Sequence, residues 1–178
     1  MGSIKCDCGG EYQTLTGQIV HFDKVLSGMD NIYLENMTVE KCSRCGDVSP
    51  YFPASDEFFN IIARAVVLQP YLLTGDEIRF LRKNRRLKAK EFAALLQIDP
   101  ATLSRWEDDK QPRSPQNDLL IRLLYVQLYN QQVGQLFPET ITDKLISLTD
   151  RADNPTIWID TQRPMKYRYA HAENLAVR

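Results

Sequence analysis

The chain has 178 residues, which is long enough for one ordinary domain or two small ones. Its 43% hydrophobic and 25% charged residues are typical of a globular protein, and no apolar run approaches the roughly 20 residues that span a bilayer. The amino terminus lacks the basic and apolar regions of a secretion signal. We therefore expect a cytoplasmic protein with no membrane partner.

The net charge of −1 conceals an uneven distribution of charge along the chain. Residues 1–60 contain 4 basic and 9 acidic residues, a net charge of −5, whereas residues 76–113 contain 10 basic and 7 acidic residues, a net charge of +3. A basic segment suits contacts with phosphate, while an acidic segment is repelled by nucleic acid. The two parts of the chain are therefore expected to bind different partners.

Short strands are predicted near the amino terminus. Alternating and β-branched residues at 12–23 and 31–39 favour a hairpin-like β unit. Residues 46–54 contain two prolines and are expected to form a linker. The apolar positions from Phe58 to Leu68 then predict a helix, which Pro70 should end.

Helix-start signals recur in the second part of the chain. Thr74 and Glu77 have the spacing of a capping box, which predicts a helix beginning near Gly75. Basic residues cluster toward the carboxyl end of that helix, at Arg79, Arg82, Lys83, Arg85 and Arg86. Three further helices are predicted at 88–96, at 100–108 after the cap Asp99, and after Ser114-Pro115, the last being apolar all round.

The end of the chain has weaker signals. Residues 139–148 are compatible with a short amphipathic helix. Residues 154–178 mix aromatic residues with scattered charges, and we predict no fold for them.

Four cysteines form two pairs, and the 133 residues after Cys45 contain none. Two turn-borne pairs can supply the four sulfur donors of a tetrahedral Zn²⁺ site, which would stabilise a module too small to bury a large core. We predict a structural zinc site with the ligands Cys6, Cys8, Cys42 and Cys45. Four thiolates would leave no position for an activated water.

These cysteines have other possible states. Two disulfides or four unconnected thiols are disfavoured in a cytoplasmic protein with this clustering. His21 is the alternative fourth ligand if the cysteines supply only three. A zinc hydrolase or nuclease would need an open metal position and a general base, and the sequence offers neither, so we predict no enzyme.

Residues 87–113 have the pattern of two helices packed across a tight turn. Their shared core is expected to contain Phe92, Leu95, Leu96, Ile98, Leu103 and Trp106. The outward positions are then Pro100, Ala101, Thr102, Ser104, Arg105 and Asp108.

This segment, over about residues 73–128, resembles the Xre/Cro-like helix-turn-helix family. Recognition helices of that family end in an aromatic residue or Leu followed by Glu, and here the pair is Trp106-Glu107. The resemblance implies that the helix beginning at Pro100 enters the major groove of DNA. Arg105 is then expected to read guanine, with Ala101, Thr102 and Ser104 near base edges.

The resemblance also implies contacts with the DNA backbone. Relatives often carry Gln at the position of Ala89, and here Lys88 or Lys90 is expected to replace it. Lys110 and Arg113 are expected to bind phosphates beyond the recognition helix. A homodimer would read a palindromic operator, with its interface on the apolar helix after Ser114 or on the tail.

The order of the parts, a zinc domain followed by a helix-turn-helix, resembles the MqsA-type antitoxin family over about residues 1–128. That family neutralises a small protein toxin through the zinc domain and represses the shared operon. The resemblance implies an antitoxin, and the alternative is a stand-alone or phage-type repressor. The predicted α+β chain comprises a β-rich zinc domain at 1–54, a connecting helix and linker at 55–73, an all-α helix-turn-helix domain at 74–130, and an extension of unassigned role at 131–178.

Overall fold

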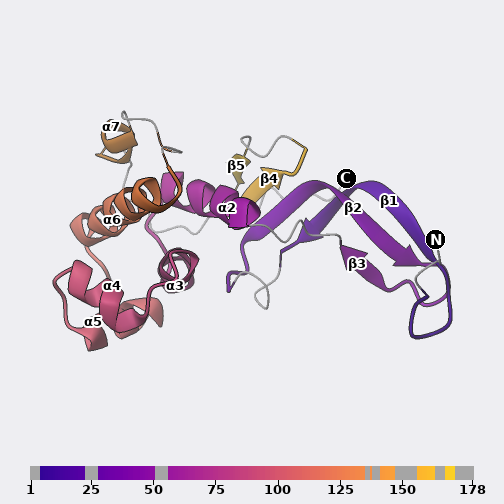
Figure 1. Cartoon of the computed structure of the whole chain (residues 1–178), viewed down its shortest axis with the longest axis horizontal. Helices are drawn as coiled ribbons and strands as arrows, with labels where there is room; N and C mark the ends of the chain where they lie inside the picture. Colours follow the sequence, from indigo (N-terminus) through magenta and orange to yellow (C-terminus); the bar gives the residue numbers. More distant parts are fainter. Residues whose placement is uncertain are drawn as a thin grey trace.

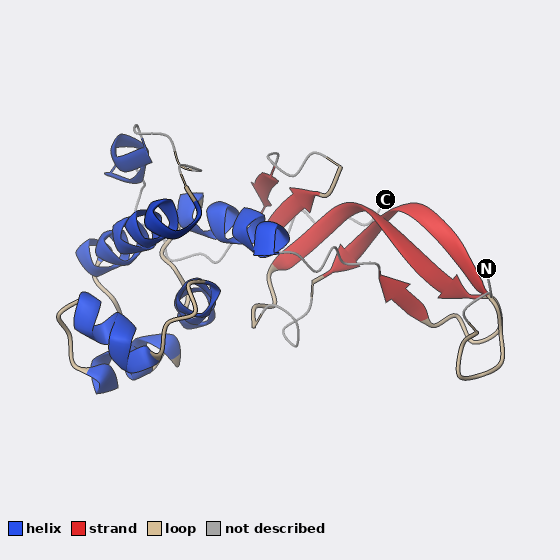
Figure 2. Ribbon diagram, viewed as in Figure 1, coloured by secondary structure: helices blue, strands red, loops and turns tan. Residues whose placement is uncertain are grey.

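A computed structural model describes residues 5–22, 28–50, 56–134, 137, 141–146, 156–162 and 167–170. Its strands are β1 (Tyr12–His21), β2 (Ile32–Cys42), β3 (Val48–Pro50), β4 (Thr156–Asp160) and β5 (Tyr167–Ala170). Its helices are α2 (Asp56–Leu68), α3 (Gly75–Asn84), α4 (Ala89–Leu95), α5 (Pro100–Glu107), α6 (Pro115–Val133) and α7 (Ile141–Ile146). The helices gather at one end of the molecule and a long β hairpin extends away from them (Figure 1, Figure 2). The predicted combination of an amino-terminal sheet with following helices is confirmed.

Strands β1 and β2 form the predicted hairpin, with Tyr12 opposite Cys42. The register shifts between Leu15 and Val20, where Gly17 adopts a φ of 71°. Such bulges bend a strand pair and increase its twist. Both cysteine pairs adjoin the same end of this hairpin, and at about 3.3 Å per residue that end lies roughly 30 Å from the end that meets the helices.

Two strands from the end of the chain complete the sheet. β4 runs parallel to β2, with Ile32 opposite Ile157, and β5 pairs antiparallel with β4. The strand order is β1-β2-β4-β5, and β3 pairs with the far part of β2. The predicted domain at 1–54 therefore accounts for only part of this sheet. Strand β4 lacks the alternating pattern of a half-buried strand because four of its five residues are buried.

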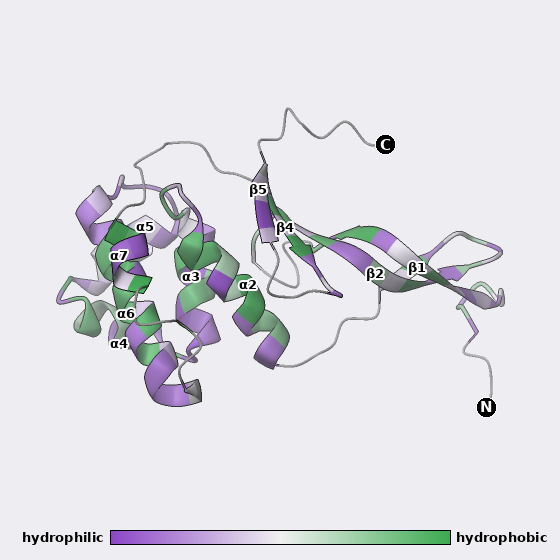
Figure 3. Cartoon of the chain, turned by 90° about the horizontal axis from the view of Figure 1, so that it is seen from above, coloured by the Kyte–Doolittle hydropathy of each residue, from purple (hydrophilic) through white to green (hydrophobic). Residues whose placement is uncertain are grey.

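Helix α2 connects the sheet with the other helices. It is mainly hydrophobic (Figure 3), and Ile62 and Val66 are fully buried in it. The Tyr169 hydroxyl of β5 donates to the Ala65 carbonyl of α2 at 2.7 Å. One continuous core includes residues of the sheet, of α2 and of the later helices, among them Leu34, Ile159, Leu73, Leu81, Ile121 and Leu145.

The predicted helix starts are confirmed. The Thr74 hydroxyl accepts from the Glu77 amide at 3.3 Å, and the Glu77 carboxylate accepts from the Thr74 amide at 2.7 Å. Helices α5 and α6 begin at the predicted prolines and are capped by Asp99 and Ser114. Among the helices that the structure describes, none combines the length and apolar character needed to cross a bilayer.

Glu77 also joins the helices to the sheet. Its buried carboxylate accepts from Asn31 Nδ2, just before β2, at 3.2 Å and from Gln69 Nε2, just after α2, at 2.7 Å. Desolvation raises the pKa of this carboxyl group, while the N–H donors around it oppose the shift. A single side chain thus caps α3 and links it to both neighbouring elements.

A buried ion pair holds α3 against α5. Arg82 Nε and Nη2 donate to the two carboxylate oxygens of Glu107 at 2.6 and 2.8 Å. Gly75 permits the close approach of the helices, because a Cβ there would lie 2.5 Å from the Glu107 carbonyl oxygen. Arg82 follows Ile78 by four residues and therefore shares its inward face.

Glu107→Gln should lower the free energy of unfolding by roughly 3 kcal/mol, because it leaves the Arg82 guanidinium buried without a counter-ion. Urea denaturation measures this loss. Glu57→Gln, an exposed position in the first turn of α2, is the matched control and should change stability by less than about 0.5 kcal/mol. Equal effects of the two substitutions would show that the ion pair does not stabilise the fold.

Candidate functional site

The four cysteines converge beyond the far end of the hairpin. Cys6 Sγ lies 3.6 Å from Cys45 Sγ, Cys8 Sγ lies 3.5 Å from Cys42 Sγ, and all four sulfur atoms lie within 4.8 Å of one another. These thiols are free, since a disulfide would need an S–S distance of about 2.05 Å. A tetrahedral metal with bonds to sulfur of about 2.3 Å places its ligands roughly 3.8 Å apart. The cluster could therefore bind one metal ion.

Each cysteine pair lies on a tight turn. In the first turn Gly9 donates its amide to the Cys6 carbonyl at 2.7 Å, and in the second Gly46 donates to the Cys42 carbonyl at 3.0 Å. The first turn contacts the second cysteine pair at Gly10. A Cβ atom at this position would lie only 2.6 Å from Cys42 Sγ. A side chain at position 10 would push the two turns apart.

The electrostatics of the cluster favour a cation. The amides of Cys45 and Arg44 donate to Cys42 Sγ and lower the pKa of this thiol to about 6. The Asp47 amide lowers the pKa of Cys45, but the other three thiols outweigh it and raise that pKa to about 12. Four adjacent sulfurs cannot all be thiolates unless a positive ion lies among them. A metal ion would supply that charge.

His21 lies outside the cysteine cluster. Its Nε2 atom is 2.8 Å from the Asp30 carbonyl oxygen, and its ring stacks on Tyr33 with the centroids 4.8 Å apart. It occupies the last position of β1, whereas the cysteines adjoin the first. The alternative ligand set with His21 is therefore not formed.

Helices α4 and α5 are joined by a tight turn, as predicted. Gln97 in this turn has a φ of 55°, and the Ile98 amide donates to the Ala93 carbonyl at 3.0 Å. The buried residues at this contact are Phe92, Ala93, Leu96, Leu103 and Trp106. The prediction for Leu95 is wrong, since this side chain is 50% exposed and lies off the face that Phe92 and Leu96 share.

One face of α5 is exposed to solvent. Ala101, Ser104 and Arg105 are exposed on it, and Thr102 is half-buried beside them. Within the described part of the chain, the contact of the Arg105 guanidinium is a long one of 3.4 Å between Nη1 and Gln111 Oε1. The four predicted base-contacting residues therefore lie together, opposite the buried face of the helix.

The predicted phosphate contacts differ in their environments. Lys88 and Lys90 are both exposed at the start of α4. The side chain of Lys110 is 71% exposed, and its Nζ lies 2.9 Å from Asp108 Oδ2. Lys110, together with Arg79, holds the pKa of the Asp108 carboxyl below its usual range.

The prediction for Arg113 needs correction. Its side chain is only 9% exposed, and its guanidinium donates to the carbonyl of Leu73 and, at 3.0 Å, to that of Trp106. Arg113 Nη1 also lies 3.0 Å from Asp109 Oδ1. These contacts tie the segment after α5 to the start of α3, so we assign Arg113 a structural role instead of a phosphate contact.

Sequence reasoning missed a polar pocket of about 340 Å³ at the helical end. Its lining residues are Asp56, Asn60, Asn84, Arg85, Arg86 and Gln132. The sequence contains a signal for the inward position of Arg85. This residue follows Ile78 and Leu81 at helical spacing and therefore continues the inward face of α3.

Comparisons of the chain with protein-family models, with curated proteins and with solved structures gave no match. Inference about function therefore starts from the residues and geometry of this chain.

Gly10→Ala should weaken the binding of Co²⁺ to the cysteine cluster by about tenfold, equivalent to about 1.4 kcal/mol, because the added Cβ displaces Cys42 Sγ. Titration followed by the sulfur-to-cobalt charge-transfer absorption measures the affinity. Gln13→Ala, exposed on β1, is the control. Identical titrations of the two variants would contradict a site formed by these two turns.

Proposed function

We propose that the chain is a sequence-specific DNA-binding repressor and that it acts as the antitoxin of a type II toxin–antitoxin pair. The exposed face of α5 is the observation that carries this proposal. That helix packs through its opposite face and follows α4 across a tight turn. Two-helix units of this form can present their second helix to the major groove of DNA.

Arg105 is the proposed base reader on α5. Its guanidinium has one long side-chain contact, so it can turn toward the O6 and N7 acceptors of guanine with little loss. Ala101 and Ser104 are small, which lets the helix come close to the base edges. Thr102 can donate a hydrogen bond or contact a thymine methyl group.

Three lysines are the proposed phosphate contacts, namely Lys88, Lys90 and Lys110. All three are exposed, and Lys110 would exchange its contact with Asp108 for a phosphate oxygen. Exposed ion pairs of this kind stabilise a fold by at most about 1 kcal/mol, so the exchange costs little. A homodimer with two such faces would bind a palindromic operator, and the exposed Leu120 on α6 is available to its interface.

We propose Zn²⁺ as the metal of the cysteine cluster. Zinc accepts four thiolates in a tetrahedron, and such a site has no position for a reactive water. Its role would be to hold the two turns together at the end of the hairpin. Metal analysis of the purified protein should give about one zinc per chain, and a fully folded metal-free hairpin would exclude this role.

The toxin-binding role is assigned to the sheet end of the molecule. The first 60 residues carry a net charge of −5, which suits a basic protein partner. Most residues of β1 are exposed, so this strand at the edge of the sheet is accessible. A stand-alone or phage-type repressor is the alternative function, in which the cysteine site only stabilises the fold.

Arg105→Ala should reduce discrimination at one base pair of each half-site by roughly 1–3 kcal/mol, because a guanine contact is lost while the fold stays intact. Selection from random duplexes identifies the site, and titration of single-base variants measures the discrimination. Lys41→Ala, at an exposed position of β2, is the control and should leave the discrimination between base pairs unchanged. Undiminished discrimination by Arg105→Ala would remove this residue from the proposed interface.

Co-expression separates the two kinds of repressor. A small reading frame next to this gene should be toxic alone and harmless when this chain is present. Arg105→Ala should still rescue growth, because neutralisation is assigned to the other end of the molecule. DNA binding without rescue would identify a stand-alone repressor.

A further inference from the structure

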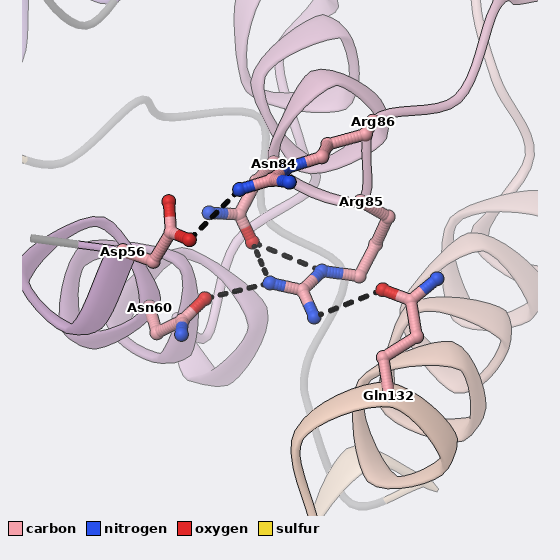
Figure 4. A pocket seen from close by; sticks show the side chains of 6 residues that line it. All are labelled: Asp56, Asn60, Asn84, Arg85, Arg86 and Gln132. Atoms are coloured by element: carbon pink, nitrogen blue, oxygen red, sulfur yellow. Dashed lines mark hydrogen bonds and ion pairs between the residues drawn. The ribbon is translucent and has the colours of Figure 1, made fainter.

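The polar pocket at the helical end lies where α2, the carboxyl end of α3 and α6 meet (Figure 4). Arg85 lies at its centre, only 5% exposed, with its guanidinium pointing between the side chains of the other two helices. The pocket has no part in the cysteine cluster or in the exposed face of α5. Its chemistry therefore needs a separate explanation.

Three side-chain amides surround the Arg85 guanidinium. Nη2 donates to Asn60 Oδ1 at 2.6 Å and to Asn84 Oδ1 at 2.7 Å. Nη1 makes a longer contact of 3.4 Å with Gln132 Oε1. Amide oxygens stabilise a cation but carry no net charge to balance it.

Two aromatic rings complete the environment of the guanidinium. Its central carbon lies 4.6 Å from the ring centroid of Tyr129 and 5.4 Å from that of Tyr125. Ring faces attract a cation through their quadrupole and leave the net charge in place. The positive charge of Arg85 is therefore buried among groups that do not neutralise it.

The other buried arginines that the structure describes have carboxylate partners. Arg82 pairs with Glu107 at 2.6 Å, and Arg122 pairs with Asp118 at 2.6 Å. Arg85 forms no ion pair within the described part of the chain. Because buried charges are normally paired, Arg85 differs from these two arginines in having amides and rings as its described partners, which is the environment of an anion-binding group.

The remaining groups of the pocket are mainly hydrogen-bond donors. The three amides turn their oxygens toward Arg85, and their NH₂ groups point in different directions (Figure 4). At the rim Arg86 pairs with Asp56 at 2.8 Å, and both side chains are more than 80% exposed. Arg86 offsets the charge of the Asp56 carboxylate through Nη2, and its other N–H groups can donate to a ligand while that pair is kept.

We propose that this pocket binds a small molecule that carries a phosphate group. Nε of Arg85 also donates to Asn84 Oδ1 at 3.2 Å, so one N–H of Nη1 is left for a ligand. The phosphate would accept hydrogen bonds from this N–H and from Arg86. A guanidinium and a phosphate match in charge and in donor geometry, and the volume of about 340 Å³ leaves room for more than the phosphate alone. The bound molecule would link α2, which adjoins the sheet, to α3 and α6.

Gln132→Glu tests this assignment, because it places a carboxylate beside Arg85 Nη1 with almost no change of shape. In the full-length chain, sodium phosphate should raise Tm above its value in sodium chloride of equal ionic strength. Gln132→Glu should stay folded and bind phosphate at least about tenfold more weakly by calorimetry, since the internal carboxylate replaces the ligand. Gln131→Glu is the matched control, because it makes the same charge change at the neighbouring residue, which does not line the pocket. This variant should bind phosphate with the wild-type affinity.

A second variant and a second probe sharpen the test. Arg86→Gln, at the exposed rim, should weaken phosphate binding several-fold without loss of fold. AMP should bind at least as tightly as inorganic phosphate, and tighter binding would indicate a nucleotide-like ligand. Absence of phosphate binding by the wild-type chain, or equal binding by Gln132→Glu and Gln131→Glu, would overturn the proposal.

Discussion

The buried ion pair between Arg82 and Glu107 determines how α5 is presented to solvent. It turns Glu107 toward α3, and the buried Leu103 and Trp106 lie on the same side of the helix. The face that contains Arg105 is consequently exposed. The pair also removes one acidic side chain from the neighbourhood of a surface that we propose meets phosphate, because its charge is neutralised inside the protein. The exposed face of α5 therefore lies opposite the face that the ion pair buries.

The two ends of the molecule are chemically distinct and are joined by few groups. At one end, four sulfur atoms from two turns lie close together beyond a long hairpin with mostly exposed residues in β1. At the other end, helices pack around a common core that reaches the sheet through α2. Glu77 connects them through hydrogen bonds to Asn31 and Gln69. This separation allows one end to bind a protein while the other binds DNA, as the proposed function requires.

Local signals in the sequence were sufficient for most helices and for the clustering of the four cysteines. Caps such as Thr74 act within one turn, and paired cysteines act through tight turns, so neither depends on distant contacts. The burial of basic side chains and the pairing of β4 depend on tertiary contacts instead. Arg113 is a basic residue in a basic segment, and only its contacts with Leu73 and Trp106 show that its side chain is mostly covered. Strand β4 joins the sheet by parallel pairing with β2, a long-range contact for which the sequence of β4 contains no periodic signal.

The central claim, that the exposed face of α5 binds DNA, is tested most directly by NMR. Isotope-labelled protein would be titrated with the duplex obtained by binding-site selection, and amide shifts would be followed along the chain. The account predicts that the largest shifts occur between Ala101 and Arg105 and at the start of α4, with little change in β1 and β2. Shifts confined to the sheet at saturating duplex, or the absence of any shift, would contradict it.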